Sequence, residues 1–140
     1  MYAVKDAPDP DGYDMLALGF WAHRAGPDPA MLRYMERVKG KSVALFGTMA
    51  AYPGSEHARQ VEGNARAALA GNRVLGTFLC QGRLAPERLA RHLDPARRDP
   101  KHPLTPERRA RLLEAEKHPD EADFVAARAA FTAFLGTLSV

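Results

Sequence analysis

Three short apolar runs mark the first half of the chain, at residues 15–20, 42–46 and 74–79. Runs of this length with few polar interruptions are typical of strands that are buried on both faces of a sheet. Helical patterns separate the runs, so the alternation predicts βαβ units with parallel strands and right-handed crossovers. The carboxyl ends of such strands lie at one edge of an open α/β sheet, where ligands bind in that architecture.

Polar residues at the borders of the apolar segments predict where the helices begin and end. Asp28 precedes a proline, which favours a helix start, and an apolar stripe follows until Gly40. Ser55 predicts the start of a second helix, which glycine and asparagine at residues 71–72 should end. A short strand is expected at residues 2–4, ahead of a turn-rich stretch.

The second half of the chain follows a different pattern. Residues 83–119 form a segment rich in proline and arginine, with two short helical patterns and no strand. Asp120 predicts the start of a last helix, whose apolar residues recur at helical spacing and should pack across the sheet as its final layer. Hydrophobic residues make up 46% of the 140 positions, which suits one core and one domain over residues 1–140.

Charge and cysteine content narrow the choice of compartment and partner. Twenty basic and 17 acidic residues give a formal net charge of +3, a balance that does not favour nucleic-acid binding. Ten basic and six acidic residues lie between Arg83 and Lys117, and we interpret this stretch as a solvated surface. Cys80 is the only cysteine, which excludes an intramolecular disulfide. With no signal-peptide pattern and no membrane-spanning run, we expect a cytoplasmic protein without membrane or nucleic-acid partners.

The histidine, serine and cysteine residues that could act as metal ligands or nucleophiles have simple structural explanations in this sequence. His23 and His57 follow or precede turns at the expected ligand edge, but no paired carboxylate or cysteine accompanies them, so no metal site is predicted. Ser55 is accounted for by helix capping. Cys80 ends a strand and is expected to be a buried structural cysteine. No catalytic residue is therefore assigned from the sequence.

Several short motifs follow one another in a characteristic order along the chain. They are Gly-Phe-Trp at residues 19–21, Phe-Gly-Thr at 46–48, Ala-Tyr-Pro at 51–53, Ser-Glu-His-Ala at 55–58, Cys-Gln-Gly at 80–82, and the tail segments 102–108 and 118–121. In order and spacing they resemble the flavodoxin-like family of FMN-binding proteins, and the resemblance covers nearly the whole chain. It implies an α/β fold: a flavodoxin-like open parallel sheet with helices on both faces.

The start of the chain departs from the pattern of that family. Its members begin with a strand, a phosphate loop of the type Ser/Thr-x-Thr-Gly-x-Thr and a first helix. The Gly-Thr pairs before the last helix, at residues 47–48 and 76–77, do not lie in such a loop. We therefore expect an N-terminally incomplete sheet, without the first strand and helix, in which the strand at 15–20 has an unpaired edge that favours a homodimer.

The missing phosphate loop should also affect the cofactor. Charge-assisted hydrogen bonds to a phosphate are each worth about 1.5–3 kcal/mol, whereas stacking on the flavin ring adds about 0.5–1.5 kcal/mol beyond area burial. The residues that the resemblance implies as ring contacts are Phe20, Trp21, His23, Gly47, Thr48, Met49 and Tyr52. Trp21 is expected to stack on one face of FMN and Tyr52 to cover the other, while residues 47–49 offer backbone N–H groups. Without the resemblance, both aromatic residues would be interpreted as amphipathic margins of the core.

The function implied by the resemblance is FMN-dependent electron transfer. The chain would act as a flavodoxin-like electron carrier or accessory redox domain, with a partner reductase or another electron donor or acceptor. Two alternatives stay open: a flavin-dependent small-molecule reductase, which needs an open pocket over the ring, and a partner-binding remnant without flavin. Turnover driven by NAD(P)H without a partner separates carrier from enzyme, and the lack of flavin separates the remnant from both. The fold alone does not choose among them.

Overall fold

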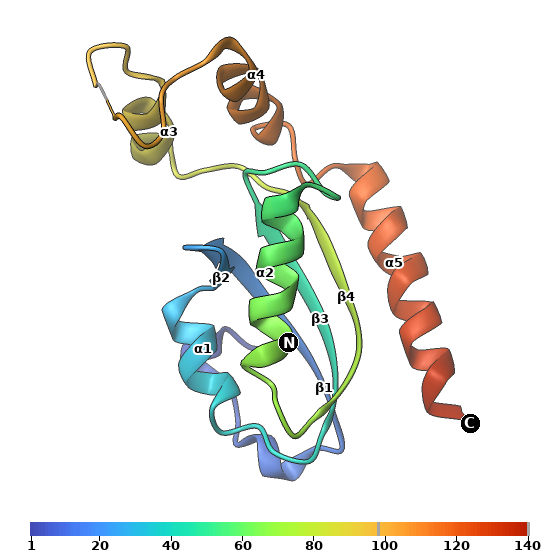
Figure 1. The fold of residues 1–140 in the computed structure, drawn as a ribbon. Coiled ribbons are helices and arrows are strands. Elements are labelled where there is room, and N and C mark those ends of the chain that lie inside the picture. Colours follow the sequence, from blue (N-terminus) through green and yellow to red (C-terminus); the bar gives the residue numbers. More distant parts are fainter. Residues whose placement is uncertain (98, 140) are drawn as a thin grey trace.

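A four-stranded sheet in the order β2-β1-β3-β4 forms the centre of the computed structural model, which describes residues 1–97 and 99–139 (Figure 1). The strands are β1 (Met15–His23), β2 (Gly26–Pro27), β3 (Ser42–Met49) and β4 (Arg73–Gln81). β1, β3 and β4 run parallel, as predicted, and each is longer than its apolar run. The short β2 was not predicted and pairs antiparallel with the end of β1.

Eight helical segments accompany the sheet in the described part of the chain. They are the 3₁₀ segments η1 (Val4–Asp6), η2 (Pro10–Gly12) and η3 (Thr137–Ser139), and the helices α1 (Pro29–Met35), α2 (Glu56–Ala67), α3 (Pro86–Leu93), α4 (Pro106–Ala115) and α5 (Glu121–Gly136). The predicted caps Asp28, Ser55 and Asp120 all accept backbone N–H groups at the starts of α1, α2 and α5. The strand predicted at residues 2–4 is wrong, because η1 forms there and no strand lies beside it to pair with.

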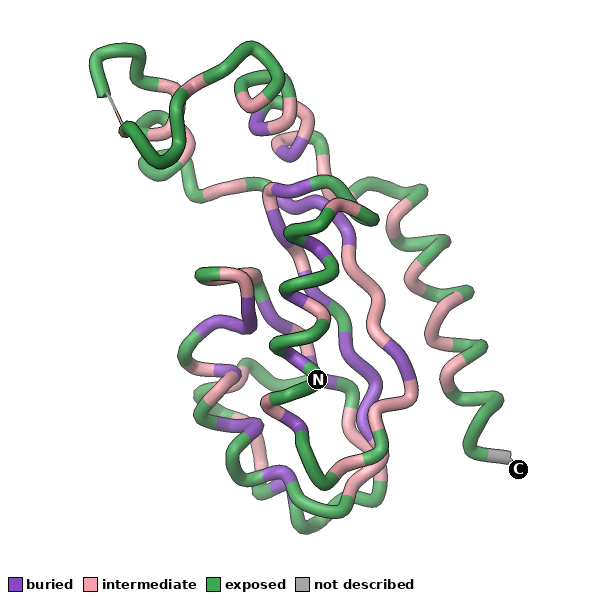
Figure 2. Tube along the Cα trace, viewed as in Figure 1, coloured by how far each residue is buried: buried purple, intermediate pink, exposed green. Residues whose placement is uncertain are grey.

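One face of the sheet is closed by α1 and α2. Most of the largest fully buried residues belong to the core between these helices and the sheet (Figure 2). They are Met35, Leu45, Leu69, Val38, Val43, Val61, Pro10 and Pro27. The N-terminal segment is tied to it by Tyr34 of α1, whose hydroxyl donates to the carbonyl of Pro8 at 3.0 Å. Burial raises the pKa of Tyr34, in keeping with a neutral phenol that acts as a donor.

The other face carries α5, which packs along β4 and part of β3 (Figure 1). The Phe131 ring meets Phe46 of β3 edge-on at a centroid distance of 5.9 Å, and the Phe134 ring lies over Gly76 of β4. No residue of this helix is buried, and in Figure 2 it alternates between intermediate and exposed positions. The helix was expected to pack across the sheet, and its main contacts are with β4 and, to a smaller extent, β3.

The segment between β4 and α5 forms a lobe that stands at the carboxyl ends of the strands (Figure 1). Its described residues contain α3 and α4 and no strand. The Arg83 N–H donates to the carbonyl of His118 at 3.1 Å, and the Leu84 N–H donates to Glu116 Oε1 at 3.1 Å, so both ends of the lobe are tied together. None of the described helices has the length and apolarity needed to span a membrane.

The outer edge of β1 pairs with β2 at Ala22 and His23. Along residues 15–21 of β1, no other strand in the described part of the chain lies against this edge. Such an edge presents unpaired backbone groups, as expected from the sequence. Pairing with a second copy stays a prediction.

Candidate functional site

An open cavity of about 640 Å³ lies between the carboxyl edge of the sheet and the α3–α4 lobe. Trp21 and Ala22 of β1 and Thr48 and Met49 of β3 line it on the sheet side, together with Gly82 just after β4. Small-molecule sites commonly measure about 300–1,000 Å³, and in open α/β sheets they lie at this edge. The cavity is therefore the candidate binding site.

A tight turn sets the position of Trp21 on this edge. β1 continues beyond the predicted apolar run at residues 15–20 to His23 and turns through Arg24 and Ala25 into β2. Both turn residues have positive φ values, 48° and 61°, as a two-residue hairpin of this hand requires. Asn64 of α2 donates from its amide to the carbonyl of Ala25 at 2.8 Å, which compensates for a backbone conformation that alanine rarely adopts.

Three neighbours hold Trp21 while part of its ring stays accessible. The buried Asp28 accepts the backbone N–H of Trp21 at 3.4 Å and also caps α1. The His23 ring meets the indole edge-on at 5.4 Å, and the guanidinium carbon of Arg88 lies 5.6 Å from the ring centroid. The side chain is 45% exposed and lines the cavity. An aromatic surface is thus available for a ligand.

The other residues implied as ring contacts lie in different surroundings. Gly47 is paired with both β1 and β4 inside the sheet, and the buried Phe20 ring packs against it, so neither lines the cavity. Tyr52 is exposed in the loop before α2 and lies outside the cavity lining. The structure therefore brings Trp21, with its neighbour His23, together with Thr48 and Met49 at the cavity. The ring-contact roles of all seven residues stay predictions.

Two polar anchors that the sequence analysis missed shape the cavity on its β4 side. The buried Gln81 donates from its amide to the carbonyl of Ala50 at 3.1 Å and to that of Arg111 at 3.4 Å, which joins the loop after β3 to α4. The Gly82 N–H donates to the carbonyl of Met49 at 2.9 Å. A Cβ on Gly82 would lie only 2.6 Å from the Thr48 side chain, so this close approach requires glycine.

The lobe side of the cavity is strongly basic. Its charged and imidazole-bearing lining residues are Arg83, Arg88, Arg108, Arg111, His92 and His102, and His57 of α2 adds a further imidazole to the cavity. No Asp or Glu lines the cavity among the described residues. The sequence analysis interpreted the arginines as a solvated surface. The spacing of the basic residues could have indicated a shared basic face on each helix. Arg108 and Arg111 lie on one face of α4 at i and i+3, and Arg88 and His92 lie on one face of α3 at i and i+4.

Burial and neighbouring positive charges set the protonation of His92 within this wall. Arg108 lies 3.1 Å from His92 Nδ1 and also donates to the carbonyl of His102. Burial lowers the pKa of His92, and the charges of Arg108 and Arg88 lower it further. The imidazole is therefore neutral at pH 7, and its Nδ1 accepts a hydrogen bond from the guanidinium.

Cys80 does not take part in the cavity. Its side chain is buried on β4, and burial, reinforced by the charges of Asp123 and Asp120, raises the pKa of the thiol to about 11. A thiol of this kind is protonated at neutral pH and is a poor nucleophile or metal ligand.

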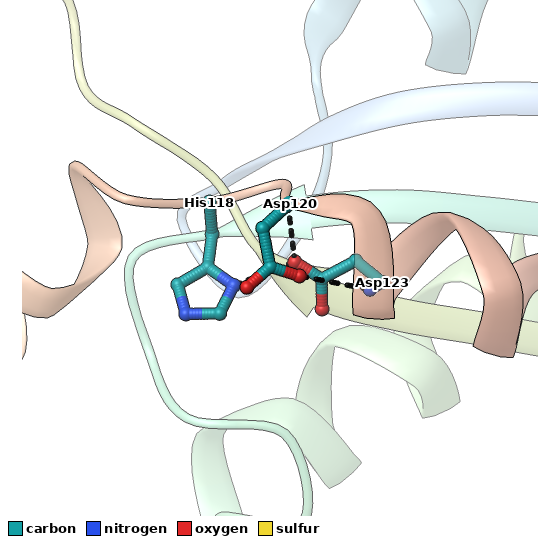
Figure 3. Close-up of side chains that lie close together, drawn as sticks. All are labelled: His118, Asp120 and Asp123. Carbon is teal, nitrogen blue, oxygen red and sulfur yellow. Dashed lines mark hydrogen bonds and ion pairs between the residues drawn. The ribbon is translucent and has the colours of Figure 1, made fainter.

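His118, Asp120 and Asp123 form a compact cluster at the start of α5 (Figure 3). The Asp123 carboxylate accepts the Asp120 N–H at 2.8 Å and lies 2.5 Å from His118 Nδ1. Asp120 in turn accepts the Asp123 N–H at 3.0 Å, which completes a capping box. The hydrogen bond to Asp123 raises the pKa of His118. These contacts explain the cluster as the polar start of a helix.

The cavity suits the cofactor that the resemblance implies. Trp21 offers an exposed aromatic surface, and Thr48 and Met49 bring the end of β3 beside it. Arg111 Nε is buried without a hydrogen-bond partner in the described part of the chain, which indicates that an acceptor is needed nearby. An aromatic ligand with an anionic group, such as FMN, matches this set of residues.

Comparisons with known proteins agree with this architecture. The sequence pattern of a family described as flavodoxin domain matches residues 1–132. The flavodoxin-like domain-containing protein BilS of Clostridioides difficile (strain CD3) is 30% identical over 116 residues. This alignment covers 82% of the chain and 66% of BilS, so the chain spans slightly less than two thirds of that relative.

Proposed function

This chain belongs to the flavodoxin domain family, and from that premise we propose that it binds FMN in the cavity under the α3–α4 lobe and carries electrons between a reductase and an acceptor. The observation that carries the proposal is the accessible Trp21 ring beside the ends of β1 and β3, inside the main cavity. Bound FMN would supply the redox chemistry by accepting and releasing electrons.

In this role the chain binds and orients the cofactor. Trp21 provides the stacking surface, and the contact with Asp28 and the hairpin after His23 limit its movement. Thr48 and Met49 line the cavity, and their backbone N–H groups would donate to the edge of a ring stacked there. Residues of the lobe line the site on the side opposite the sheet edge. Electron transfer requires no acid, base or nucleophile from the protein.

Titration of FMN fluorescence tests the proposal. Trp21→Ala should weaken FMN binding by about 1–3 kcal/mol, because both stacking and buried ring area are lost. Tyr13→Ala is a matched control, since Tyr13 is also an exposed aromatic but precedes β1, at the opposite end of that strand. If the parent bound no flavin, the chain would be a partner-binding module without flavin. If it bound FMN and both variants bound it equally well, Trp21 would not be the stacking surface and the proposed site would be wrong.

A small-molecule reductase is a second candidate, favoured by the basic lobe wall. Seven arginine and histidine residues line the cavity, more polar groups than a stacked ring requires. They would offer binding groups to an acidic substrate held beside the cofactor. Oxidation of NAD(P)H by the FMN-loaded protein with small acceptors, in the absence of a partner protein, would support the reductase. A lack of such turnover together with flavin binding would support the carrier.

A further inference from the structure

We propose that the α3–α4 lobe carries an anion-binding subsite, formed by Arg88, Arg108 and Arg111, which takes a phosphate or carboxylate group of a ligand in the cavity. The inference goes beyond the proposed function, because an anion can bind this wall without flavin. Only the case in which the anion is the phosphate of FMN rests on that function.

The first argument is the balance of charge at the subsite. All three guanidiniums line the cavity, and no carboxylate does so in the described part of the chain. None of the ion pairs found among the described residues involves these three arginines; the basic partners are Arg37, Arg59, Arg66, Lys117 and His118. Guanidiniums with one sign of charge in a cleft repel one another and attract anions. A bound anion would relieve this repulsion.

The second argument is one buried arginine donor that has no acceptor. Arg111 Nε is buried and lacks a hydrogen-bond partner in the described residues. Burying an unpaired donor costs free energy, and arginine offers donors in a planar fork that suits carboxylate and phosphate. The neutral His92 and the carbonyl of His102 orient the guanidinium of Arg108. The wall is therefore ordered before any ligand binds.

The third argument is the position of Arg88, which indicates the class of ligand. Its guanidinium lies over the Trp21 ring at 5.6 Å, so the basic wall and the aromatic surface adjoin. A ligand that uses both would be a flat, conjugated molecule with an acidic group. The acidic group could come from FMN itself or from a separate substrate, and the experiment distinguishes these sources.

Trp21 is the only tryptophan and serves as a probe next to the subsite. Inorganic phosphate is titrated into the full chain at constant ionic strength, with sodium chloride as the matched salt. Phosphate should change the fluorescence of Trp21 in a saturable way that chloride does not reproduce. FMN and riboflavin, which share a ring and differ in the phosphate, are titrated in parallel.

The two sources give different results. If the subsite takes the phosphate of FMN, FMN should bind about tenfold or more tightly than riboflavin, and inorganic phosphate should compete with FMN but not with riboflavin. If it takes a separate acid, FMN and riboflavin should bind equally, and phosphate should bind together with both. Loss of flavin binding with an intact phosphate response would remove the proposed function and leave the subsite standing.

Variants of the arginines test whether the phosphate response depends on the α3–α4 lobe. Arg108→Gln and Arg111→Gln should each weaken the phosphate response, or the preference for FMN, by about tenfold. Arg109→Gln is the matched control, because Arg109 lies on the same helix, is exposed and does not line the cavity. Circular dichroism checks that each variant is folded. The subsite is refuted if the parent shows neither a saturable phosphate response nor a preference for FMN, or if all three variants behave alike.

Discussion

The two faces of the central sheet differ in how fully they are packed. On the face covered by α1 and α2, Met35, Val38 and Leu45 have no exposed surface. On the opposite face, Phe46 is 39% exposed and Leu135 of α5 is 44% exposed. Because the burial of apolar surface is the main favourable term in folding, the α1–α2 face should supply most of the stability.

The attachment of α5 shows how the less buried face is held. Two phenylalanines meet the sheet, while polar contacts act at the two ends of the helix. A capping box forms its start, and Arg73 of β4 donates to the carbonyl of Thr137 just after its end at 2.9 Å. Polar contacts at exposed helix ends are individually weak, so this face should tolerate substitution better than the other.

The largest expected difference comes from removing a leucine from each face. Leu45→Ala should destabilise the protein by about 2–5 kcal/mol, because it leaves a cavity among fully buried neighbours. Leu135→Ala should cost about 0.5 kcal/mol or less, since that side chain is largely exposed. Urea unfolding followed by circular dichroism measures both. Equal losses in the two variants would mean that the two faces contribute equally to the free energy of unfolding.

A smaller difference is expected from adding a methyl group at a glycine on each face. A Cβ on Gly47 would lie 2.7 Å from the enclosed Phe20 ring, and one on Gly76 would lie 2.0 Å from the Phe134 ring of α5. Gly47→Ala should cost about 1–3 kcal/mol, because its neighbours have no room to move. Gly76→Ala should cost less, since α5 can shift towards solvent.

A double variant separates packing from backbone effects at Gly76. In a Phe134→Ala background, the cost of Gly76→Ala should fall to near zero, because the ring that it meets is gone. The free energies of unfolding of the single and double variants test this coupling. If Gly76→Ala were as costly as Gly47→Ala, α5 would be as firmly packed as α1 and α2.

The smallest expected effect is a pH dependence confined to the α5 face. The pKa of His118 is raised in the folded protein, chiefly by its hydrogen bond to Asp123. The contribution of His118 to the stability of the fold is therefore fully present below the pKa of an unfolded histidine, near 6.5. The contribution is lost as the pH rises through the folded pKa. The pKa of Asp123 is lowered, because hydrogen bonds from His118 and Asp120 outweigh the effect of burial.

Stability measured from pH 5 to pH 9 tests this sign. The free energy of unfolding of the parent should exceed that of His118→Gln most between about pH 5 and 6.5, and the difference should shrink at higher pH. His57→Gln, at an exposed histidine of α2 outside this cluster, is the control for the loss of an imidazole. The cost of Leu45→Ala should be independent of pH in this range, since the lost contacts are apolar. A difference that grew with pH would contradict the assigned ion pair.

Local patterns predicted much of this fold. The three main strands, the caps at Asp28, Ser55 and Asp120, and the parallel order all appear as expected. They depend on short-range chemistry, since a side-chain oxygen at a helix start bonds the next turn and an apolar run needs two covered faces. The strand predicted at residues 2–4 failed because a strand needs a neighbour that local sequence does not reveal.

The candidate site could be predicted only in part. Its location at the carboxyl edge, together with Trp21, Thr48 and Met49, followed from the strand pattern and the family resemblance. The burial of Phe20 did not, because the face to which a strand residue points depends on the register of the whole sheet. The hairpin after His23 was missed, since neither of its turn residues is the glycine or asparagine that usually marks such a turn.

The sequence by itself determined the three main strands, the caps at Asp28, Ser55 and Asp120, and the family of this protein, because these follow from spacing and motif order along the chain. Only the tertiary structure decided that Arg88, Arg108 and Arg111 line one cavity. The physical reason is that a helix of arginines has the same local pattern whether or not another part of the chain lies opposite it. The α3–α4 lobe stands beside the sheet edge, which is far away in sequence, so one face of each helix lines an open cavity that no Asp or Glu lines among the described residues.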